Sequence, residues 1–239
     1  MKNLLVYHFK TYLKSYKLLL PFLIYLIYLF AAYGIMPFSI VSSFSESAGV
    51  LFFIMAFVGF SYAELENPVT EQLVLLRVNN DTLYYLSRLT VLLIIGVVMS
   101  ILGILYPLVL NSVNNNLLFT RSLQFEDVAI GLFLHCLMAF LGAMTGSFFH
   151  PRIIRNRKMA VLLLFFASVM GISKGALADY FPPTRLIAWV FPPVFDILAS
   201  FTSLEFFVIP AMALPVTLAL VYGLVLMIGQ IKLLKRAKF

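Results

Sequence analysis

The feature that most limits how this chain can fold is a series of six long apolar runs. A bilayer core of about 30 Å is crossed by roughly 20 helical residues, and each run approaches or exceeds that length. The runs are continuous and lack the alternation of a barrel strand, so helices are the spanning form that fits them. The sequence therefore predicts an all-α integral membrane protein with six transmembrane helices. The runs cover residues 18–36, 47–63, 89–110, 128–149, 159–178 and 206–231.

The composition disfavours the common soluble classes. Of the 239 residues, 62% are hydrophobic and 11% are charged, whereas soluble domains average about 45–50% and 25%. One globular core cannot hide that excess, which argues against a soluble enzyme, a nucleic-acid-binding domain and a disordered chain. The net charge of +7 does not indicate nucleic-acid binding, because the basic residues lie at the ends of apolar runs.

The distribution of lysine and arginine predicts the orientation in the membrane. Positively charged residues accumulate on the cytoplasmic side of membrane proteins. If both termini are cytoplasmic, the outer segments hold only Arg121 and Arg185, and Lys174 falls inside the fifth run. We therefore expect both termini to be cytoplasmic. The inner segments then hold fourteen of the 17 basic residues, namely Lys2, Lys10, Lys14, Lys17, Arg77, Arg88, Arg152, Arg155, Arg157, Lys158, Lys232, Lys235, Arg236 and Lys238.

Residues 1–17, which precede the first run, predict an amphipathic elbow helix. On a helical wheel, Phe9 and Leu13 fall on an apolar face, and Lys10 and Lys14 fall on the polar one. Such a helix lies in the inner interface of the membrane with its lysines near anionic lipid. The alternative is a simple juxtamembrane extension of the first span.

The first inner connection, residues 64–88, predicts a short helix, a turn and a second helix. Asn67 is suited to cap a helix, and Pro68 is suited to its first position. Residues 79–81, with the sequence Asn-Asn-Asp, then interrupt the helix, and Thr82 can cap the next one. We expect this connection to be the most structured of the loops.

Two further features belong to the inner side of the membrane. The second helix of the first connection would place Tyr84 and Tyr85 at the membrane surface. The second inner connection, residues 150–158, is short and strongly basic. Both connections would face the cytoplasm.

The outer connection, residues 179–205, is interrupted by two proline pairs at 182–183 and 192–193. The apolar stretches beside these prolines are too short to span a bilayer. One interpretation is a re-entrant segment, with helices that dip into the outer leaflet under the shelter of the protein. The other is an ordinary interfacial loop anchored by Trp189.

Lys174 is the one charge well inside an apolar run. Charges within the membrane are costly and often functional. The side chain could snorkel outward toward Asp179, or it could line a substrate path.

The sequence offers no catalytic or metal-binding motif. It has no phosphate-binding GxxxxGK[ST] loop and no HExxH pair, and its three histidines are scattered over three segments. The small residues of 142–147 are typical of helix packing more than of an intramembrane serine nucleophile. We therefore expect no catalytic residue, metal site or cofactor in this chain. The alternatives of a polytopic membrane enzyme acting on lipid or peptide, and of a membrane scaffold or sensor, stay open.

The order of these features resembles the membrane subunit, or permease, of a type-2 ABC exporter. The likeness covers nearly the whole chain: an elbow helix, six spans, both ends inside, a structured first inner loop and a broken apolar segment before the last span. The best local match runs from Glu71 to Asn80 and on to Arg88, a segment that resembles the coupling helix of that family. Compact permeases of this kind resemble exporters of bacteriocins and phenol-soluble modulins in Gram-positive bacteria.

The resemblance implies a function that depends on partners. Two copies of a cytoplasmic ATP-binding-cassette ATPase, with ATP and magnesium, would drive a pair of permease subunits in the cell membrane, as a homodimer or a heterodimer. The cargo would be amphipathic or hydrophobic, a peptide by analogy, and Lys174 is the candidate for its path. A second ATPase contact would come from Arg152, Arg155 and Arg157. The ATPase-coupling residues would be Glu71, Gln72, Leu73, Leu75, Leu76, Arg77, Asn79 and Asn80.

Overall fold

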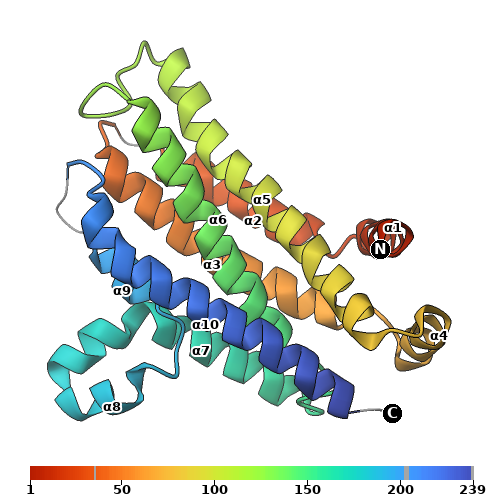
Figure 1. Ribbon diagram of the computed structural model, residues 1–239. Helices are drawn as coiled ribbons and strands as arrows, with labels where there is room; N and C mark the ends of the chain where they lie inside the picture. The colour runs from red at the N-terminus through yellow and green to blue at the C-terminus, as the bar shows by residue number, and fades with distance from the viewer. Residues whose placement is uncertain (35, 202–204, 238–239) are drawn as a thin grey trace.

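A computed structural model describes residues 1–34, 36–201 and 205–237 of the chain. Within these ranges the regular structure is helical, apart from a single bridge between Phe38 and Phe119. The predicted all-α class is confirmed. Figure 1 shows the long helices running side by side through the molecule.

Five helices in the described residues are long and apolar enough to cross a membrane. They are α3 (Ile40–Ala63), α5 (Asp81–Val113), α6 (Phe125–Phe148), α7 (Arg157–Tyr180) and α10 (Ile209–Arg236). The predicted run 18–36 is different, because its helix α2 (Leu19–Ala32) has only 14 residues, roughly 21 Å at 1.5 Å per residue. It counts as a sixth candidate span only together with α1 (Lys2–Lys14), from which it is bent by 72°.

Helix α3 begins seven residues earlier than the predicted start at residue 47. Two of the intervening serines, at positions 43 and 45, look like loop residues, yet they are buried within the helix. Ser43 and Ser45 donate hydrogen bonds to the carbonyls of Ile40 and Val41, at 3.0 and 2.7 Å. A hydroxyl that donates to a carbonyl of its own helix has its hydrogen bond satisfied without water. This allows a polar stretch of helix to be buried in the core.

The core is built around the pair α3 and α6. Small residues on α6 let the two backbones approach closely: a Cβ atom added at Gly142 or Gly146 would collide with the carbonyl oxygen of Phe52 or Ala56 on α3. This confirms the packing interpretation of residues 142–147. Helix α3 is the most buried of the five spans and α10 the least, with 72% and 17% of their apolar windows buried.

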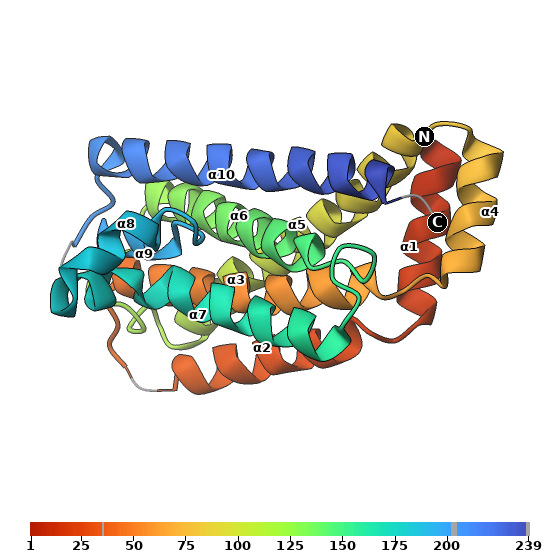
Figure 2. The ribbon, with the colours of Figure 1, turned by 90° about the horizontal axis from the view of Figure 1, so that it is seen from below.

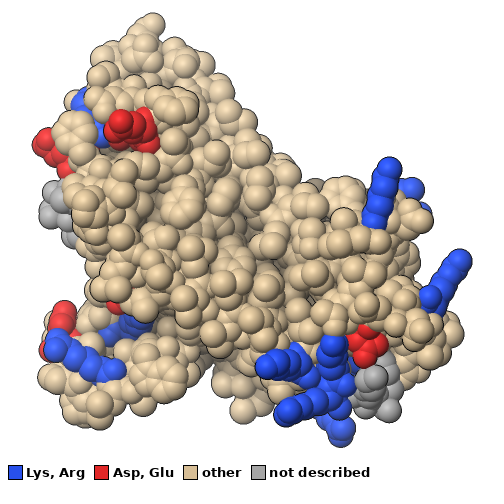
Figure 3. Space-filling model, in the orientation of Figure 1, with Lys and Arg blue, Asp and Glu red and all other residues tan. Residues whose placement is uncertain are grey.

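Helices α1 and α4 (Pro68–Val78) lie across one end of the long helices, and the start of α1 and the end of α10 lie at that same end (Figure 2). Lys and Arg side chains gather there as well (Figure 3). We call it the basic end. Its placement in the cytoplasm, and that of the α1 elbow in the membrane interface, stay predictions.

The opposite end carries the interrupted segment that follows α7. It contains the 3-10 turn η1 (Pro182–Thr184) and two short helices, α8 (Arg185–Ala188) and α9 (Val194–Ala199). Its two apolar halves differ, because α9 is packed into a core cluster with α3, α6 and α10, whereas α8 is exposed. Re-entry of this segment into the membrane stays a prediction.

Candidate functional site

The short helix α4 forms where its capping residues were predicted. The side chain of Asn67 accepts the backbone N–H of Val69 at 3.0 Å, and Pro68 occupies the first position. The helix ends at Asn79, which adopts the left-handed conformation with φ 49°. The next cap differs from the prediction: Asn80, not Thr82, accepts the N–H of Leu83 and begins α5.

One face of α4 is exposed and largely apolar. Val69, Leu73 and Leu76 are 61%, 63% and 78% exposed, and Arg77 is exposed beside them. A groove of about 650 Å³ runs from this helix to the end of α10. The groove is lined by Gln72, Leu75, Leu76, Asn79, Asn80, Asp81, Thr82, Tyr85, Arg152, Leu234 and Lys235.

Glu71 lies on the opposite face of α4 and is buried. Its carboxylate is 3.3 Å from a guanidinium nitrogen of Arg88 and 2.6 Å from one of Arg152. The Glu71 side chain is therefore enclosed by the protein, and that of Arg152 is mostly enclosed, with 3% and 12% of their surfaces exposed; contact of either residue with a partner stays a prediction. Each buries its charge against an opposite one, because a buried unpaired charge is costly.

A second carboxylate, Glu66, completes this buried cluster. It lies 3.3 Å from the imidazole Nδ1 of His8 on α1 and 4.0 Å from Arg88, and it accepts a hydrogen bond from the Tyr84 hydroxyl. Arg88 also donates to the carbonyl of Tyr62 at 3.2 Å. We call Glu66, Glu71, Arg88 and Arg152, with His8, the charge junction.

The electrostatics of the junction follow from burial and opposite charge. Burial alone would raise the pKa of Glu66, but the imidazole of His8, the charge of Arg88 and the Tyr84 hydroxyl lower it to about 2. Burial raises the pKa of Glu71 despite the neighbouring guanidinium groups, and burial lowers the pKa of His8. With both carboxylates ionised and His8 neutral, two negative charges balance two positive ones.

Apolar packing surrounds these charges. Tyr84 and Tyr85 are buried in a cluster with Leu234 of α10, and their predicted place at the level of the membrane surface stays a prediction. Val74 and Leu75 of α4 pack against the same cluster. The junction therefore joins α1, α4, α5 and the 150–158 connection, and the apolar cluster beside it adds α10.

The other basic residues of the second inner connection stay at the surface. Arg155 is exposed, and Arg157 forms an exposed ion pair with Glu64 at 2.7 Å. Only Arg152 of the three predicted contacts turns inward. Arg155 and Arg157 are accessible to a partner.

Lys174 sits at the opposite end of the molecule from the junction. It is buried and its ammonium is 2.5 Å from the carboxylate of Asp196 on α9. The predicted partner was wrong, because Asp179 instead pairs with Arg185 at 3.3 Å. Lys174 lines a cavity, and its role in a substrate path stays a prediction.

The structure also brings together a serine and a histidine that the sequence did not pair. Ser47 Oγ is 2.9 Å from Nε2 of His135, whose Nδ1 lies 2.7 Å from the carbonyl of Gly131. The carbonyl can only accept, so Nδ1 carries the proton and Nε2 accepts from the serine. Both side chains are fully buried between α3 and α6, which makes this pair a packing contact. No spacing signal could link residues 88 positions apart.

No group of three or more His, Cys, Asp or Glu residues suited to a metal ion occurs among the described residues. Comparisons of the chain with protein-family models, with curated proteins and with solved structures found no match.

Proposed function

We propose that this chain is the membrane subunit of an ATP-driven exporter, coupled to its ATPase through α4. The observation that carries the proposal is the two-sided character of α4. Its outer face offers exposed apolar and basic side chains at the basic end, and its inner face is held through Glu71 to Arg88 of α5 and to Arg152 of the 150–158 connection. A helix built this way is suited to receive force from a cytoplasmic partner.

The charge junction makes independent motion of α4 unfavourable. Separating one partner from a buried ion pair costs about 3–5 kcal/mol, and Glu71 is held by two guanidinium groups. A displacement of α4 would therefore carry α5 along through Arg88. Helix α5 has 33 residues, so it extends roughly 50 Å from the junction to the far end of the molecule.

The partner and cargo follow from the same proposal. The sequence has no phosphate-binding loop of its own, so ATP and magnesium would bind to two ATPase subunits, and a second permease subunit would complete the membrane part. Gln72, Leu73, Leu76, Arg77 and the groove beside them would contact the ATPase, with Arg155 and Arg157 as a second contact. The cargo would be an amphipathic or hydrophobic molecule, with peptide as the first candidate.

The test is to purify the tagged chain from its native membrane in mild detergent and identify the proteins that accompany it by mass spectrometry. The expected result is a Walker-motif ATPase at a near one-to-one ratio. Changing L73D and L76D together should abolish its recovery, because both side chains face outward. A matched control is L117D, an exposed leucine at the opposite end, which should retain the ATPase. Recovery of the chain alone in several mild detergents would refute the proposal.

A further inference from the structure

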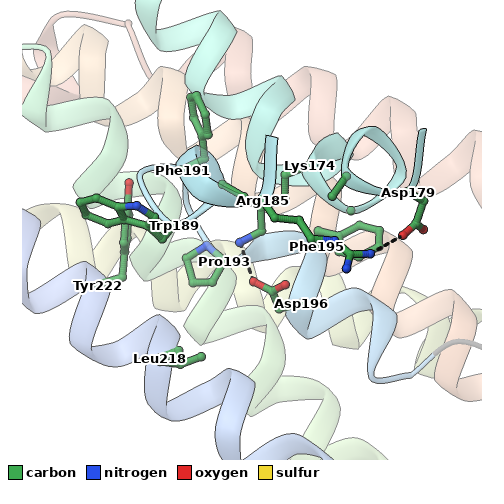
Figure 4. Close-up of a pocket in the computed structure, with 13 residues that line it drawn as sticks. Lys174, Asp179, Arg185, Trp189, Phe191, Pro193, Phe195, Asp196, Leu218 and Tyr222 are labelled. Atoms are coloured by element: carbon green, nitrogen blue, oxygen red, sulfur yellow. Dashed lines mark hydrogen bonds and ion pairs between the residues drawn. The ribbon is translucent and has the colours of Figure 1, made fainter. Parts of the chain in front are cut away.

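A cavity of about 490 Å³ opens between α7, α8, α9 and α10, at the end of the molecule opposite the basic end (Figure 4). Its volume falls in the range of small-molecule sites, roughly 300–1,000 Å³. Its lining combines charged side chains, among them Lys174 and Asp196, with aromatic ones such as Trp189.

The first component of the lining is a pair of opposite charges at its floor. The Lys174 side chain is 9% exposed and that of Asp196 is 42% exposed, with 2.5 Å between the ammonium nitrogen and a carboxylate oxygen. A second pair, Arg185 and Asp179, stands at the mouth and is mostly exposed. The lining residues therefore include two positive and two negative groups.

The second component is an aromatic and aliphatic wall. Trp189 and Tyr222 lie side by side on one flank of the cavity, and Phe195 lies on the other (Figure 4). The Tyr222 hydroxyl donates to the carbonyl of Val190 at 2.8 Å, which fixes this wall to α10. Tryptophan and tyrosine are enriched at the level of lipid head groups.

The third component is an apolar track that leaves the cavity along α10. Leu218 lines the cavity, and Leu214, Val221 and Val225 continue the same helical face and are exposed. Residues three or four positions apart share one face of a helix. A ligand seated in the cavity would find a continuous surface for hydrocarbon chains beside it.

The charges select the kind of head group. A purely anionic ligand would compete with Asp196 for Lys174, and a purely cationic one would compete with Lys174 for Asp196, so each would leave a charge poorly paired. An ammonium has three donors and a carboxylate has about four acceptor sites, so both side chains can take a further partner while they stay paired. A zwitterion supplies one partner to each.

We propose that this cavity binds the head group of a zwitterionic phospholipid, phosphatidylethanolamine being the simplest, with its acyl chains along the exposed face of α10. The phosphate would lie against Lys174 and Arg185, and the ammonium against Asp196 and the face of Trp189, where cations are attracted to the ring. This inference is independent of the exporter function, since it requires no ATPase.

The experiment uses the full chain in detergent and the fluorescence of Trp189, which is the only tryptophan in the sequence. Dihexanoyl phosphatidylethanolamine is added below its own micelle concentration. Parallel titrations use dihexanoyl phosphatidylglycerol as an anionic lipid and hexyltrimethylammonium as a cation. We expect a saturable change in emission with the zwitterionic lipid. The concentration that gives half of that change should be at least tenfold lower than with either of the other two compounds. Equal midpoints for all three would overturn the proposal.

Free phosphoethanolamine distinguishes a lipid from a soluble head group. We expect it to need at least tenfold higher concentration than the lipid, because it lacks the chains that would contact α10. Equal potency would overturn the assignment to lipid.

Variants test the role of the ion pair. K174Q with D196N should raise the lipid midpoint at least tenfold and remove the preference for a zwitterion. The exchanged pair K174D with D196K keeps one charge of each sign and should retain binding within about threefold. The control R121Q with D127N removes an ion pair that does not line the cavity and should bind like the wild type. Unchanged lipid binding by K174Q with D196N, in protein that elutes and unfolds like the wild type, would refute the proposal.

Discussion

Removing the Glu71 carboxylate should destabilise the protein more than removing any exposed charge. The side chain is 3% exposed and contacts two guanidinium groups, at 3.3 and 2.6 Å. The change E71A leaves Arg88 and Arg152 facing each other, with Glu66 as the one remaining carboxylate of the junction. Breaking a buried pair by removing one partner costs about 3–5 kcal/mol.

Thermal unfolding in detergent measures this loss. A change of 1 kcal/mol moves the Tm of a chain of this size by about 2–4 °C, so E71A should lower the Tm by roughly 6–20 °C. The matched control is E64A, whose partner Arg157 is 76% exposed. Exposed ion pairs contribute little to stability, so the Tm of that variant should stay within experimental error of the wild type.

A double-mutant cycle then separates the pair from the rest of the junction. R152A alone should lower the Tm by less than E71A, because Glu71 keeps Arg88. The double variant should lower it by less than the sum of the two single effects, with a coupling of about 0.5–3 kcal/mol. A Tm for E71A within about 1 °C of the wild type, or strict additivity in the cycle, would refute the view that Glu71 ties α4 to the long helices.

Three further predictions concern stability. The pKa of Glu66 is lowered to about 2 in the folded protein and is near 4.5 when the chain is unfolded, so its contribution to the free energy of unfolding is complete above pH 4.5 and is lost as the pH falls toward 2. The wild-type Tm should therefore fall across that pH window, and E66Q should lack this part of the pH dependence of the Tm. G146A should destabilise the protein by at least 1–3 kcal/mol, because the added methyl meets the backbone of α3, whereas G229A, which has room, should have little effect on the Tm. S47A should cost about 1–3 kcal/mol in unfolding measurements, since it leaves the buried Nε2 of His135 without its donor; a Tm equal to that of the wild type would contradict this.

Local signals in the sequence predicted the parts of the fold that depend on neighbours along the chain. The caps at Asn67 and Pro68 and the break at Asn79 follow from the chemistry of single residues and their adjacent backbone. The apolar runs predicted six spans, and five of them correspond to helices long and apolar enough to cross a membrane on their own. The length of α2 was overestimated because an apolar run indicates which residues can lie in lipid or in a protein core, not where the helix ends.

The polar residues were harder to place because their partners are distant in sequence. Lys174 had Asp179 five positions away, but the fold brings Asp196 closer and buries the lysine side chain, while that of Asp196 stays partly exposed. Glu71 was expected among the ATPase-coupling residues of a short helix, whereas in the fold its carboxylate lies against Arg88 and Arg152. In both cases the preferred partner depends on which helices pack together, and hydrophobic periodicity does not encode that choice.

Helix α10 runs from the cavity near Lys174 to the apolar cluster beside the charge junction. Tyr222 belongs to the wall of the lipid cavity, and Leu234 packs in the cluster beside the charge junction. They lie twelve positions apart on one continuous helix, roughly 18 Å at 1.5 Å per residue. Helix α10 is also the least buried of the five spans, so fewer contacts oppose its displacement. If a partner moves α4 in the proposed exporter, the contact at Leu234 offers a route by which that motion reaches the cavity wall, because no break or proline interrupts α10 between Tyr222 and Leu234.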